Sequence, residues 1–458
     1  MNRKYFGTDG IRGQANKFPV TADMALRVAM AAATVLKAEN TGSHKSRILI
    51  GKDTRLSCYM LEQALTAGFL SMGMDVLLTG PIPTPAVAML TRSLRADAGI
   101  MISASHNKYA DNGIKIFAGD GYKLPDAIEH KIEALVDDNH FDSRLALPDE
   151  LGRAARIDDA PFGVLGRYME FLKTSLPKGA NLRGLKVVVD AANGAAYKVA
   201  PMVLWELEAE VVSIGTTPNG KNINERCGAT DTAALQQKVI DEQADVGIAL
   251  DGDADRLILV NEKGERVDGD QILALLASHM KAQGTLHKNT LVATVMSNLG
   301  LERYCADQGI HFIRTPVGDR YVVEEMRTHG YNLGGEQSGH MILSDFGTTG
   351  DGLMTALHVL HLLKESGRTS SDLLNSFSPL PQLLKNVRYE AGNPLEDSRV
   401  QHLIDSIKTE MAQNGRILVR ASGTEPVIRV MAEGDDDRTI ANAVDRICQA
   451  IEETGKRA

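Results

Sequence analysis

The segment DGDADR carries three aspartates at alternating positions, Asp251, Asp253 and Asp255. Three carboxylates placed this close repel one another, and a hard divalent cation with oxygen ligands removes the repulsion. Mg²⁺ fits such a set if a phosphate group supplies a further oxygen. The segment therefore predicts a divalent metal site, and a solvated acidic turn is the plain alternative.

An EF-hand is a second interpretation of the same aspartates, because Glu262 stands at the twelfth position of the D-x-D-x-D pattern. The sixth position argues against it, since Arg256 stands where a calcium loop needs glycine for its sharp turn. The residues that follow, LILV, have the composition of a β-strand rather than a loop. We therefore expect magnesium and not an EF-hand.

The segment SASHN at 103–107 follows an apolar run that is typical of a buried strand. Ser103 or Ser105 could be a nucleophile, but Ser105 and His106 do not form a hydrolase pair, because neighbours on an extended chain point apart. The chain also has no GxSxG nucleophile elbow. A serine that carries a phosphoryl group fits better, because it needs only a metal and cations nearby.

The segment RASGTEPVIR at 420–429 gathers donors for an anion. Glycine lets backbone N–H groups approach a ligand, hydroxyls add donors, and guanidinium groups match phosphate oxygens. We expect a phosphate-binding loop, with a plain turn before a strand as the alternative. Its candidate ligands are Arg420, Ser422, Gly423, Thr424 and Arg429.

The segment GEQSGH at 335–340 places Glu336 and Ser338 two residues apart, on one side of an extended loop. That spacing suits the binding of adjacent sugar hydroxyls, and His340 could accept a proton. An ordinary glycine-rich turn is the alternative.

The elements that precede these loops repeat along the chain. Three β-branched runs, RILIGKDTR, KVVVDAANG and TLVATVMSN, begin at residues 47, 186 and 290. After each come a helical pattern, a second strand, and a third segment that ends in the serine loop, the aspartate loop or the GEQSGH loop. This order predicts three related α/β domains with helix-covered mixed sheets, and we expect their polar loops to converge.

A chain of 458 residues is long enough for three or four domains, at about 100 to 200 residues each. We expect domains at 1–155, 156–254 and 255–370, followed by a smaller α+β domain at 371–458. The stretch GRTSS at 367–371 is the expected linker to that last domain.

Composition excludes several kinds of partner. The formal net charge of −9 argues against general nucleic-acid binding. The start MNRKYFGTDGIRG lacks the apolar core of a signal peptide, and no segment approaches the roughly 18 apolar residues that span a membrane. Four widely spaced cysteines without a CxxC pair fit buried free thiols in a reducing compartment. We expect a cytoplasmic protein without nucleic-acid or membrane partners, and a homodimer is one option for its assembly.

In their order along the chain, the four loops resemble the motifs of the α-D-phosphohexomutases, and the match runs from Tyr5 to Val430. The resemblance implies that Ser105 is phosphorylated and that its phosphate binds Mg²⁺ together with the three aspartates. It also implies that Glu336 and Ser338 hold sugar hydroxyls and that the 420–429 loop holds the phosphate that does not react. The remaining site residues that it implies are Arg12, His106, Lys115, Arg256 and His340, with Lys115 or His340 as the acid/base.

The resemblance further implies phosphoryl transfer between positions of a phosphosugar, with a sugar 1,6-bisphosphate as intermediate and activator. The segments KYFGTDGIRG, ISASHN and GEQSGH are most similar to those of the branch that acts on hexosamine phosphates, and Gln337 is part of that similarity. A phosphomannomutase/phosphoglucomutase and a non-catalytic module that binds a metal or a phosphosugar are the alternatives.

Two positions depart from the family pattern. Lys108 stands where proline is common, so the serine loop loses a fixed φ and we expect it to be more mobile. Ala254 stands where glycine is frequent, which matters only if that residue needs a positive φ.

Overall fold

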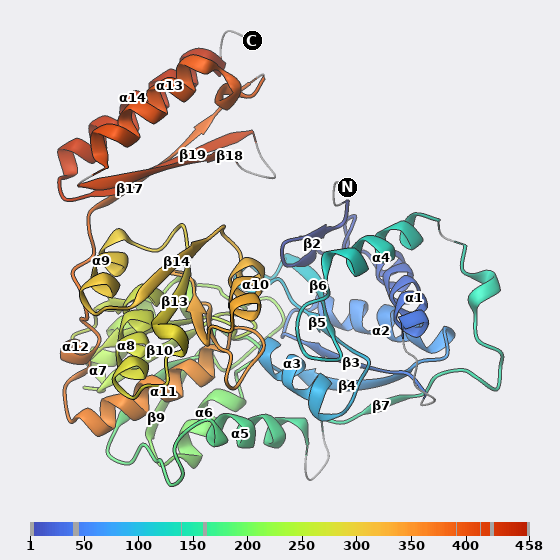
Figure 1. The fold of residues 1–458 in the computed structure, drawn as a ribbon. Coiled ribbons are helices and arrows are strands. Elements are labelled where there is room, and N and C mark those ends of the chain that lie inside the picture. The colour runs from blue at the N-terminus through green and yellow to red at the C-terminus, as the bar shows by residue number, and fades with distance from the viewer. Residues whose placement is uncertain are drawn as a thin grey trace.

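The computed structural model describes residues 4–39, 45–138, 140–158, 163–390, 392–412, 414–421 and 426–455. Three α/β units pack against one another, and a smaller fourth unit stands apart from them at the end of a connecting segment (Figure 1). Within these ranges, no helix combines the length and the apolar composition that crossing a bilayer requires.

The first unit is a mixed sheet with helices on its faces. Its elements are β1 (Phe6–Gly7), β2 (Gly10–Gln14), α1 (Ala22–Glu39), β3 (Arg47–Lys52), α2 (Ser57–Ser71), β4 (Asp75–Pro81), α3 (Thr84–Ser93), β5 (Ala98–Ile102), β6 (Asp111–Ala118), α4 (Asp126–Asp138), the 3₁₀ turn η1 (Asp142–Arg144) and β7 (Ala154–Arg156). The strand order is β1-β2-β6-β5-β3-β4-β7. The apolar strands β3 and β5 lie inside the sheet and are almost fully buried, as expected for strands covered on both faces.

Helix α5 (Val164–Thr174) leads into the second unit, whose sheet order is β12-β11-β10-β8-β9. The elements of this unit are β8 (Lys186–Asp190), α6 (Val199–Glu206), β9 (Glu210–Ile214), η2 (Gly228–Thr230), α7 (Ala233–Asp241), β10 (Val246–Leu250), β11 (Leu257–Asn261) and β12 (Arg266–Val267).

The third unit has the sheet order β14-β13-β15-β16. Its elements are α8 (Gly269–Ala282), η3 (His287–Asn289), β13 (Thr290–Thr294), α9 (Leu299–Asp307), β14 (His311–Thr315), α10 (Asp319–His329), β15 (Leu333–Gly335), β16 (Met341–Leu343), α11 (Gly352–Ser366) and α12 (Ser370–Leu373).

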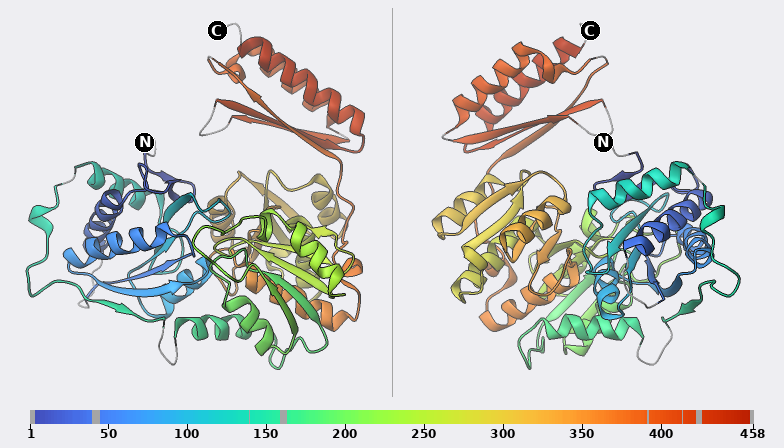
Figure 2. Two further views of the ribbon diagram at one scale, coloured as in Figure 1. Left: turned by 180° about the vertical axis from the view of Figure 1, so that it is seen from behind. Right: turned by 45° about the vertical axis from the view of Figure 1, so that its right-hand side comes forward.

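The fourth unit is an antiparallel sheet, β17-β19-β18, with two long helices on one face (Figure 2). Its elements are β17 (Gln382–Arg388), η4 (Pro394–Glu396), α13 (Ser398–Met411), β18 (Gly415–Ala421), β19 (Val427–Gly434) and α14 (Asp437–Gly455). The unit has a hydrophobic core of its own, which includes Val430 and Ile447. A different core joins the other three units and contains, for example, Leu49, Val189 and Leu291.

The predicted threefold repeat is confirmed. In each α/β unit the third, first and second strands of the repeat lie side by side in parallel, as β5-β3-β4, β10-β8-β9 and β15-β13-β14. An antiparallel strand, β6, β11 or β16, then pairs with the third strand. The loop between the third strand and its antiparallel partner is in each unit one of the polar loops that the sequence singled out.

Two of the expected domain boundaries cut through sheets. Strand β7 pairs with β4, so the boundary between residues 155 and 156 falls inside a strand of the first sheet. Strands β11 and β12 continue the second sheet beyond β10, so that sheet ends at Val267 and not at residue 254. The aspartate loop is therefore the turn of a hairpin within the second unit.

The linker expected at 367–371 is wrong. Gly367 ends α11 in the left-handed conformation, with φ of 60°. Ser370 and Ser371 are buried, and their hydroxyls donate to the Glu262 carboxylate over 2.7 and 2.5 Å. Gly, Ser and Thr serve helix caps as well as linkers, which explains the error. The connection to the fourth unit lies instead between α12 and β17.

Candidate active site

The polar loops of the three α/β units meet. Ser105, in the loop after β5, donates its hydroxyl hydrogen to Asp251 Oδ2 over 2.6 Å. Leu257, at the end of the aspartate loop, donates its N–H to the Gly339 carbonyl of the third loop over 2.9 Å. The side chains that carry the predicted chemistry are therefore brought together from all three repeats.

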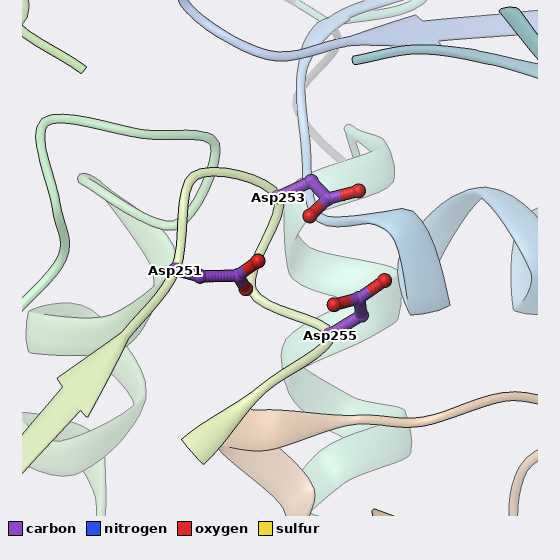
Figure 3. Close-up of side chains that lie close together, drawn as sticks. All are labelled: Asp251, Asp253 and Asp255. Carbon is purple, nitrogen blue, oxygen red and sulfur yellow. The ribbon is translucent and has the colours of Figure 1, made fainter. Parts of the chain in front are cut away.

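Asp251, Asp253 and Asp255 surround the tight turn between β10 and β11 (Figure 3). All three are buried, and each offers a carboxylate oxygen within 4.8 Å of the others. Oδ1 of Asp253 and Oδ1 of Asp255 are buried and have no hydrogen-bond partner in the described part of the chain. Buried oxygens without partners, in a set of hard ligands, fit a divalent cation.

The surroundings shift the pKa values of Asp251 and Asp255 in opposite directions. Burial, Asp255 and Asp253 raise the pKa of Asp251 well above its usual range. For Asp255, burial acts in the same direction, but Lys115 and His340 outweigh it and hold its pKa well below the usual range. Asp251 is thus the carboxylate whose charged form the surroundings disfavour most, and a divalent cation would favour the charged form of all three.

Lys115 lies on β6 and reaches the metal loop from the first unit. Its Nζ is 2.9 Å from Asp253 Oδ2, 3.4 Å from Asp255 Oδ2 and 3.1 Å from Asp9 Oδ2. Burial disfavours the ammonium form, but Asp253, Asp9 and Asp255 raise the pKa of Lys115 well above its usual value. Lys115 is therefore charged at neutral pH and can hold the oxygens of a phosphoryl group.

His340 bridges two carboxylates. Its Nδ1 is 3.6 Å from Asp255 Oδ1, and its Nε2 is 3.5 Å from Asp319 Oδ2 and 3.2 Å from the Gly350 nitrogen. Burial disfavours the charged ring, but Asp255 and Asp319 raise the pKa of His340 to about 8. Both ring nitrogens therefore face protein groups, which suits a role in orienting Asp255.

Three charged residues that were not among the predicted site residues, Asp9, Lys123 and Asp319, connect the first unit to the third. Lys123 Nζ is 2.6 Å from Asp319 Oδ2 and also contacts Asp9 Oδ1. Asp9 in turn contacts Arg12 Nη2. A sequence signal existed only for Asp9, which shares the segment GTDGIRG with Arg12.

The other predicted residues also border the site. The N–H of Arg256 donates to Asp251 Oδ1 over 3.2 Å, and the Arg256 Nε is 3.9 Å from Asp255 Oδ1. His106 Nδ1 is 3.5 Å from Ser105 Oγ. Burial, followed by the charges of Arg256 and Arg12, lowers the pKa of His106 to about 4, so this ring is neutral at pH 7.

The serine loop is held by Arg55, which the sequence analysis also missed. Arg55 is fully buried, and its Nε donates to Asp53 Oδ2 over 2.8 Å. Its Nη2 donates to the carbonyls of Ser105 and Asn107 over 3.0 and 2.8 Å. Its Nη1 donates to the carbonyl of Lys108. These bonds fix the backbone at Lys108 without the ring of a proline.

Asn224 of the second unit binds the same loop from the opposite domain. Its Nδ2 donates to the carbonyls of Ser105 and Asn107 over 2.8 and 2.9 Å. Ser105 itself has a φ of 49°, in the left-handed region that is costly for a residue other than glycine. The loop is thus held in a strained conformation that presents the Ser105 hydroxyl to the metal loop.

Ala254 is also in the left-handed region, with φ of 58°. Because this residue has a positive φ, the presence of alanine where the family often has glycine does matter here. A left-handed backbone conformation costs an alanine about 1 kcal/mol relative to glycine.

The GEQSGH loop, which is expected to bind the sugar, lies beside a cavity of about 380 Å³ that Glu336 and Ser338 help to line. Ser338 donates its hydroxyl hydrogen to Glu336 Oε2 over 3.2 Å, and Gly318 donates its N–H to Glu336 Oε1 over 3.0 Å. The predicted pair therefore shares one cavity, with Glu336 held in place by the backbone before α10.

Arg420 and Arg429 are direct cross-strand neighbours on β18 and β19. Burial and the charge of Arg429 lower the pKa of Arg420. Like charges facing each other destabilise a sheet unless an anion lies between them. The other predicted phosphate ligands, Ser422, Gly423 and Thr424, lie outside the described residues.

Comparison with known proteins shows that the whole chain resembles one enzyme family, domain by domain. The phosphoglucomutase/phosphomannomutase profiles match in chain order: alpha/beta/alpha domain I at residues 3–143, domain II at 166–264, domain III at 268–380, and the C-terminal domain at 384–450. The chain is 58% identical over 451 residues to the phosphoglucosamine mutases of Rhizobium johnstonii and Agrobacterium fabrum, covering 98% of each chain in both alignments.

Among solved structures, a phosphoglucomutase/phosphomannomutase family protein from Burkholderia thailandensis has the same fold, with a TM-score of 0.80, 24% identity and 98% coverage of both chains. The N-acetylphosphoglucosamine mutase of Aspergillus fumigatus, solved with GlcNAc-6P and magnesium, matches with a TM-score of 0.65 and 18% identity, over 99% of this chain and 96% of that one. With its four domain matches, its full-length relatives and its three converging loops, the chain belongs to the phosphoglucomutase/phosphomannomutase family of α-D-phosphohexomutases.

Proposed function

We propose that the protein is a phosphoglucosamine mutase, which interconverts glucosamine 6-phosphate and glucosamine 1-phosphate. The carrying observation is the 2.6 Å hydrogen bond from Ser105 Oγ to Asp251, within a buried set of three metal-binding carboxylates. The identity of 58% with curated phosphoglucosamine mutases supports the choice of an amino sugar. The product would enter the synthesis of amino-sugar nucleotides and cell-wall precursors in the cytoplasm.

Mg²⁺ would be held by Asp251, Asp253 and Asp255 together with the phosphate on Ser105. When bound, it supplies positive charge that stabilises the transferring phosphoryl group. Oδ1 of Asp253, which is buried and accepts no hydrogen bond within the described ranges, supports this assignment.

In the proposed transfer, the bond between phosphorus and Ser105 Oγ breaks as a bond to a sugar hydroxyl oxygen forms. The hydroxyl proton leaves to a base, and the oxygen of Ser105 takes up a proton. Of the two expected candidates, Lys115 and His340, only the neutral form of His340 can accept that proton, because Lys115 is already charged at neutral pH. The charged Lys115, Arg12 and Arg256 hold the transferring oxygens. The result is a sugar 1,6-bisphosphate and an unphosphorylated serine.

The bisphosphate must then turn over, so that its other phosphate returns to Ser105. Arg420 and Arg429 of the fourth unit would hold whichever phosphate does not react, while Glu336 and Ser338 hold the sugar hydroxyls in both orientations. One phosphate-binding loop therefore serves both directions. A sugar bisphosphate would also restore the phosphate on Ser105 when the enzyme has lost it.

The test is kcat/KM for the 6-phosphates of glucosamine, glucose and mannose, with Mg²⁺ and a sugar 1,6-bisphosphate present. We expect a preference for glucosamine 6-phosphate above about tenfold, which equals about 1.4 kcal/mol of transition-state discrimination. Equal or better turnover of glucose or mannose 6-phosphate would assign the protein to the phosphomannomutase/phosphoglucomutase branch. A protein that binds metal but turns over none of the three would be a binding module.

A further inference from the structure

The sugar-binding cavity contains a carboxylate for which the transfer itself has no use. Asp268 lines this cavity together with Glu336, Gln337 and Ser338. It precedes α8, and its Oδ1 accepts from the N–H groups of Asp270 and Gln271 over 3.1 and 3.4 Å, as the N-cap of that helix. The cap uses one oxygen of the carboxylate.

Asp268 is fixed relative to the sugar-binding loop. The neighbouring Gly269 donates its N–H to the Gln337 carbonyl over 3.0 Å. A Cβ atom on Gly269 would lie 2.3 Å from the Glu336 carbonyl oxygen, so the two backbones are in direct contact. The backbone at Asp268 is therefore packed directly against the backbone of the loop that carries Glu336.

The surroundings of Asp268 raise its pKa on balance, and a cationic group beside it would favour the ionised carboxylate. Burial raises its pKa, whereas the helix N–H of Gln271, the charge of Arg266 and a side-chain hydrogen bond from Gln337 act in the opposite direction. Gln337 lines the same cavity as Asp268.

A sugar hydroxyl both donates and accepts hydrogen bonds, whereas an ammonium group only donates. Glu336 already accepts from Gly318 and Ser338 and is the proposed ligand for sugar hydroxyls. A second carboxylate in the same cavity favours a cationic substituent.

We propose that Asp268 accepts a hydrogen bond from the 2-ammonium group of glucosamine phosphate and so determines the preference for the amino sugar. This inference rests on the proposed function.

The test compares wild type with Asp268→Asn in kcat/KM for glucosamine 6-phosphate and glucose 6-phosphate, with Mg²⁺ and glucose 1,6-bisphosphate present. Asparagine still caps a helix, so α8 keeps its N-terminal bonds. We expect kcat/KM for glucosamine 6-phosphate to fall by about tenfold or more, and that for glucose 6-phosphate to change less than about threefold. Asp397→Asn, at the N-cap of α13 in the fourth unit, is the matched control and should leave the ratio unchanged.

An equal loss for both sugars, or an unchanged ratio in Asp268→Asn, would overturn the inference while the wild-type preference for glucosamine stands. A wild type without that preference would overturn the proposed function and the inference with it. If Asp268→Asn does not fold, Asp268→Ser retains a capping hydroxyl without the charge, and the same ratios apply.

Discussion

Each aspartate of the metal loop has a different set of partners, and Asp253 has the most connections to the first unit. Its Oδ2 accepts from Thr84 Oγ1 over 2.6 Å and from Lys115 Nζ over 2.9 Å. Its backbone carbonyl accepts from the Thr84 N–H over 2.9 Å. These bonds occupy Oδ2 and leave Oδ1 of Asp253 without a hydrogen bond among the described residues.

Asp253→Asn should impair metal binding without unfolding the protein. The amide lacks the charge that a divalent cation requires, so we expect the affinity for Mg²⁺ to fall by about tenfold or more. We expect kcat to fall by about 100-fold, equal to about 2.7 kcal/mol. Calorimetric titration with Mg²⁺ and steady-state kinetics measure the two effects. Asp241→Asn, an exposed change on α7, is the control, and unchanged Mg²⁺ affinity in Asp253→Asn would rule out this metal site.

Site residues could be predicted from the sequence where several of them stand together in one short segment. Ser105 and the three aspartates could be named because each stands in a compact motif after a buried strand. Lys123 and Asp319 could not, because they meet across 196 residues through the packing of two domains, and each alone resembles an ordinary surface charge.

At the scale of elements, the loop after β3 supports the loop after β5. Arg55 and Asp53 come from the segment KDTR, directly after β3, and form a buried ion pair over 2.8 Å. Asp53 Oδ2 also accepts from the Ser103 hydroxyl over 2.6 Å, and Ser103 Oγ accepts from the Ser105 N–H over 2.9 Å. The conformation of the serine loop thus depends on two neighbouring strands.

Arg55→Ala should disorganise the serine loop. It removes the donors to three loop carbonyls and leaves the buried Asp53 without its partner, so we expect a loss of about 3 kcal/mol in the free energy of unfolding. We also expect kcat to fall by more than about tenfold, because Ser105 is no longer held toward the metal loop. Urea unfolding and kinetics test this, with the exposed Arg47→Ala on β3 as control. A variant with wild-type kcat would show that Arg55 does not position Ser105.

Asp270, at the contact between α8 and α9, should make the free energy of unfolding depend on pH. Asp270, in the first turn of α8, accepts from the Asn298 N–H over 2.8 Å. Burial, together with Asp268, raises the pKa of Asp270 from 3.8 to about 7. The folded state therefore holds a proton that the unfolded state releases, so this contribution is complete below about pH 4 and is lost as pH rises to about 7.

Asp270→Asn should remove that contribution. Relative to wild type, we expect the variant to gain stability from pH 5 to pH 8, by at most about 1.4 kcal/mol per pH unit. Urea unfolding of both proteins at several pH values measures the difference. A difference that does not change with pH would contradict the proposed protonation of Asp270.

At the scale of the whole molecule, the fourth unit makes few contacts with the rest. Arg303 on α9 pairs with Asp435 over 2.5 Å. Arg416 Nη2 donates to the carbonyls of Val295 and Ser297 over 2.9 and 2.8 Å. In this arrangement the unit stands away from the three loops (Figures 1 and 2). Transfer without loss of the bisphosphate requires it to approach them.

We expect glucose 1,6-bisphosphate to close the molecule and so to decrease its radius of gyration in small-angle X-ray scattering. Arg420→Ala should weaken this response and raise KM by about tenfold, because a charged hydrogen bond to the phosphate is lost. Arg446→Ala on α14, which removes an exposed pair with Glu410, is the control. An unchanged radius of gyration in the wild type would contradict closure.

The repeated architecture was predictable because each unit repeats one order of strands and helices. The boundaries were not, since β11 and β12 join the second sheet by hairpin pairing that no composition change marks. The expected linker failed for a related reason: Ser370 and Ser371 become buried only because Glu262 of the second unit lies against them.

The central claim is that Ser105 carries the phosphoryl group that is transferred. The most direct measurement loads the protein from ³²P-labelled glucose 1,6-bisphosphate, maps the label by mass spectrometry, and follows its release to glucosamine 6-phosphate. We predict label on Ser105 alone, complete transfer to a sugar bisphosphate, and a folded Ser105→Ala variant that neither takes up label nor turns over substrate. Label on another residue, label that the sugar cannot remove, or turnover by Ser105→Ala would contradict the mechanism.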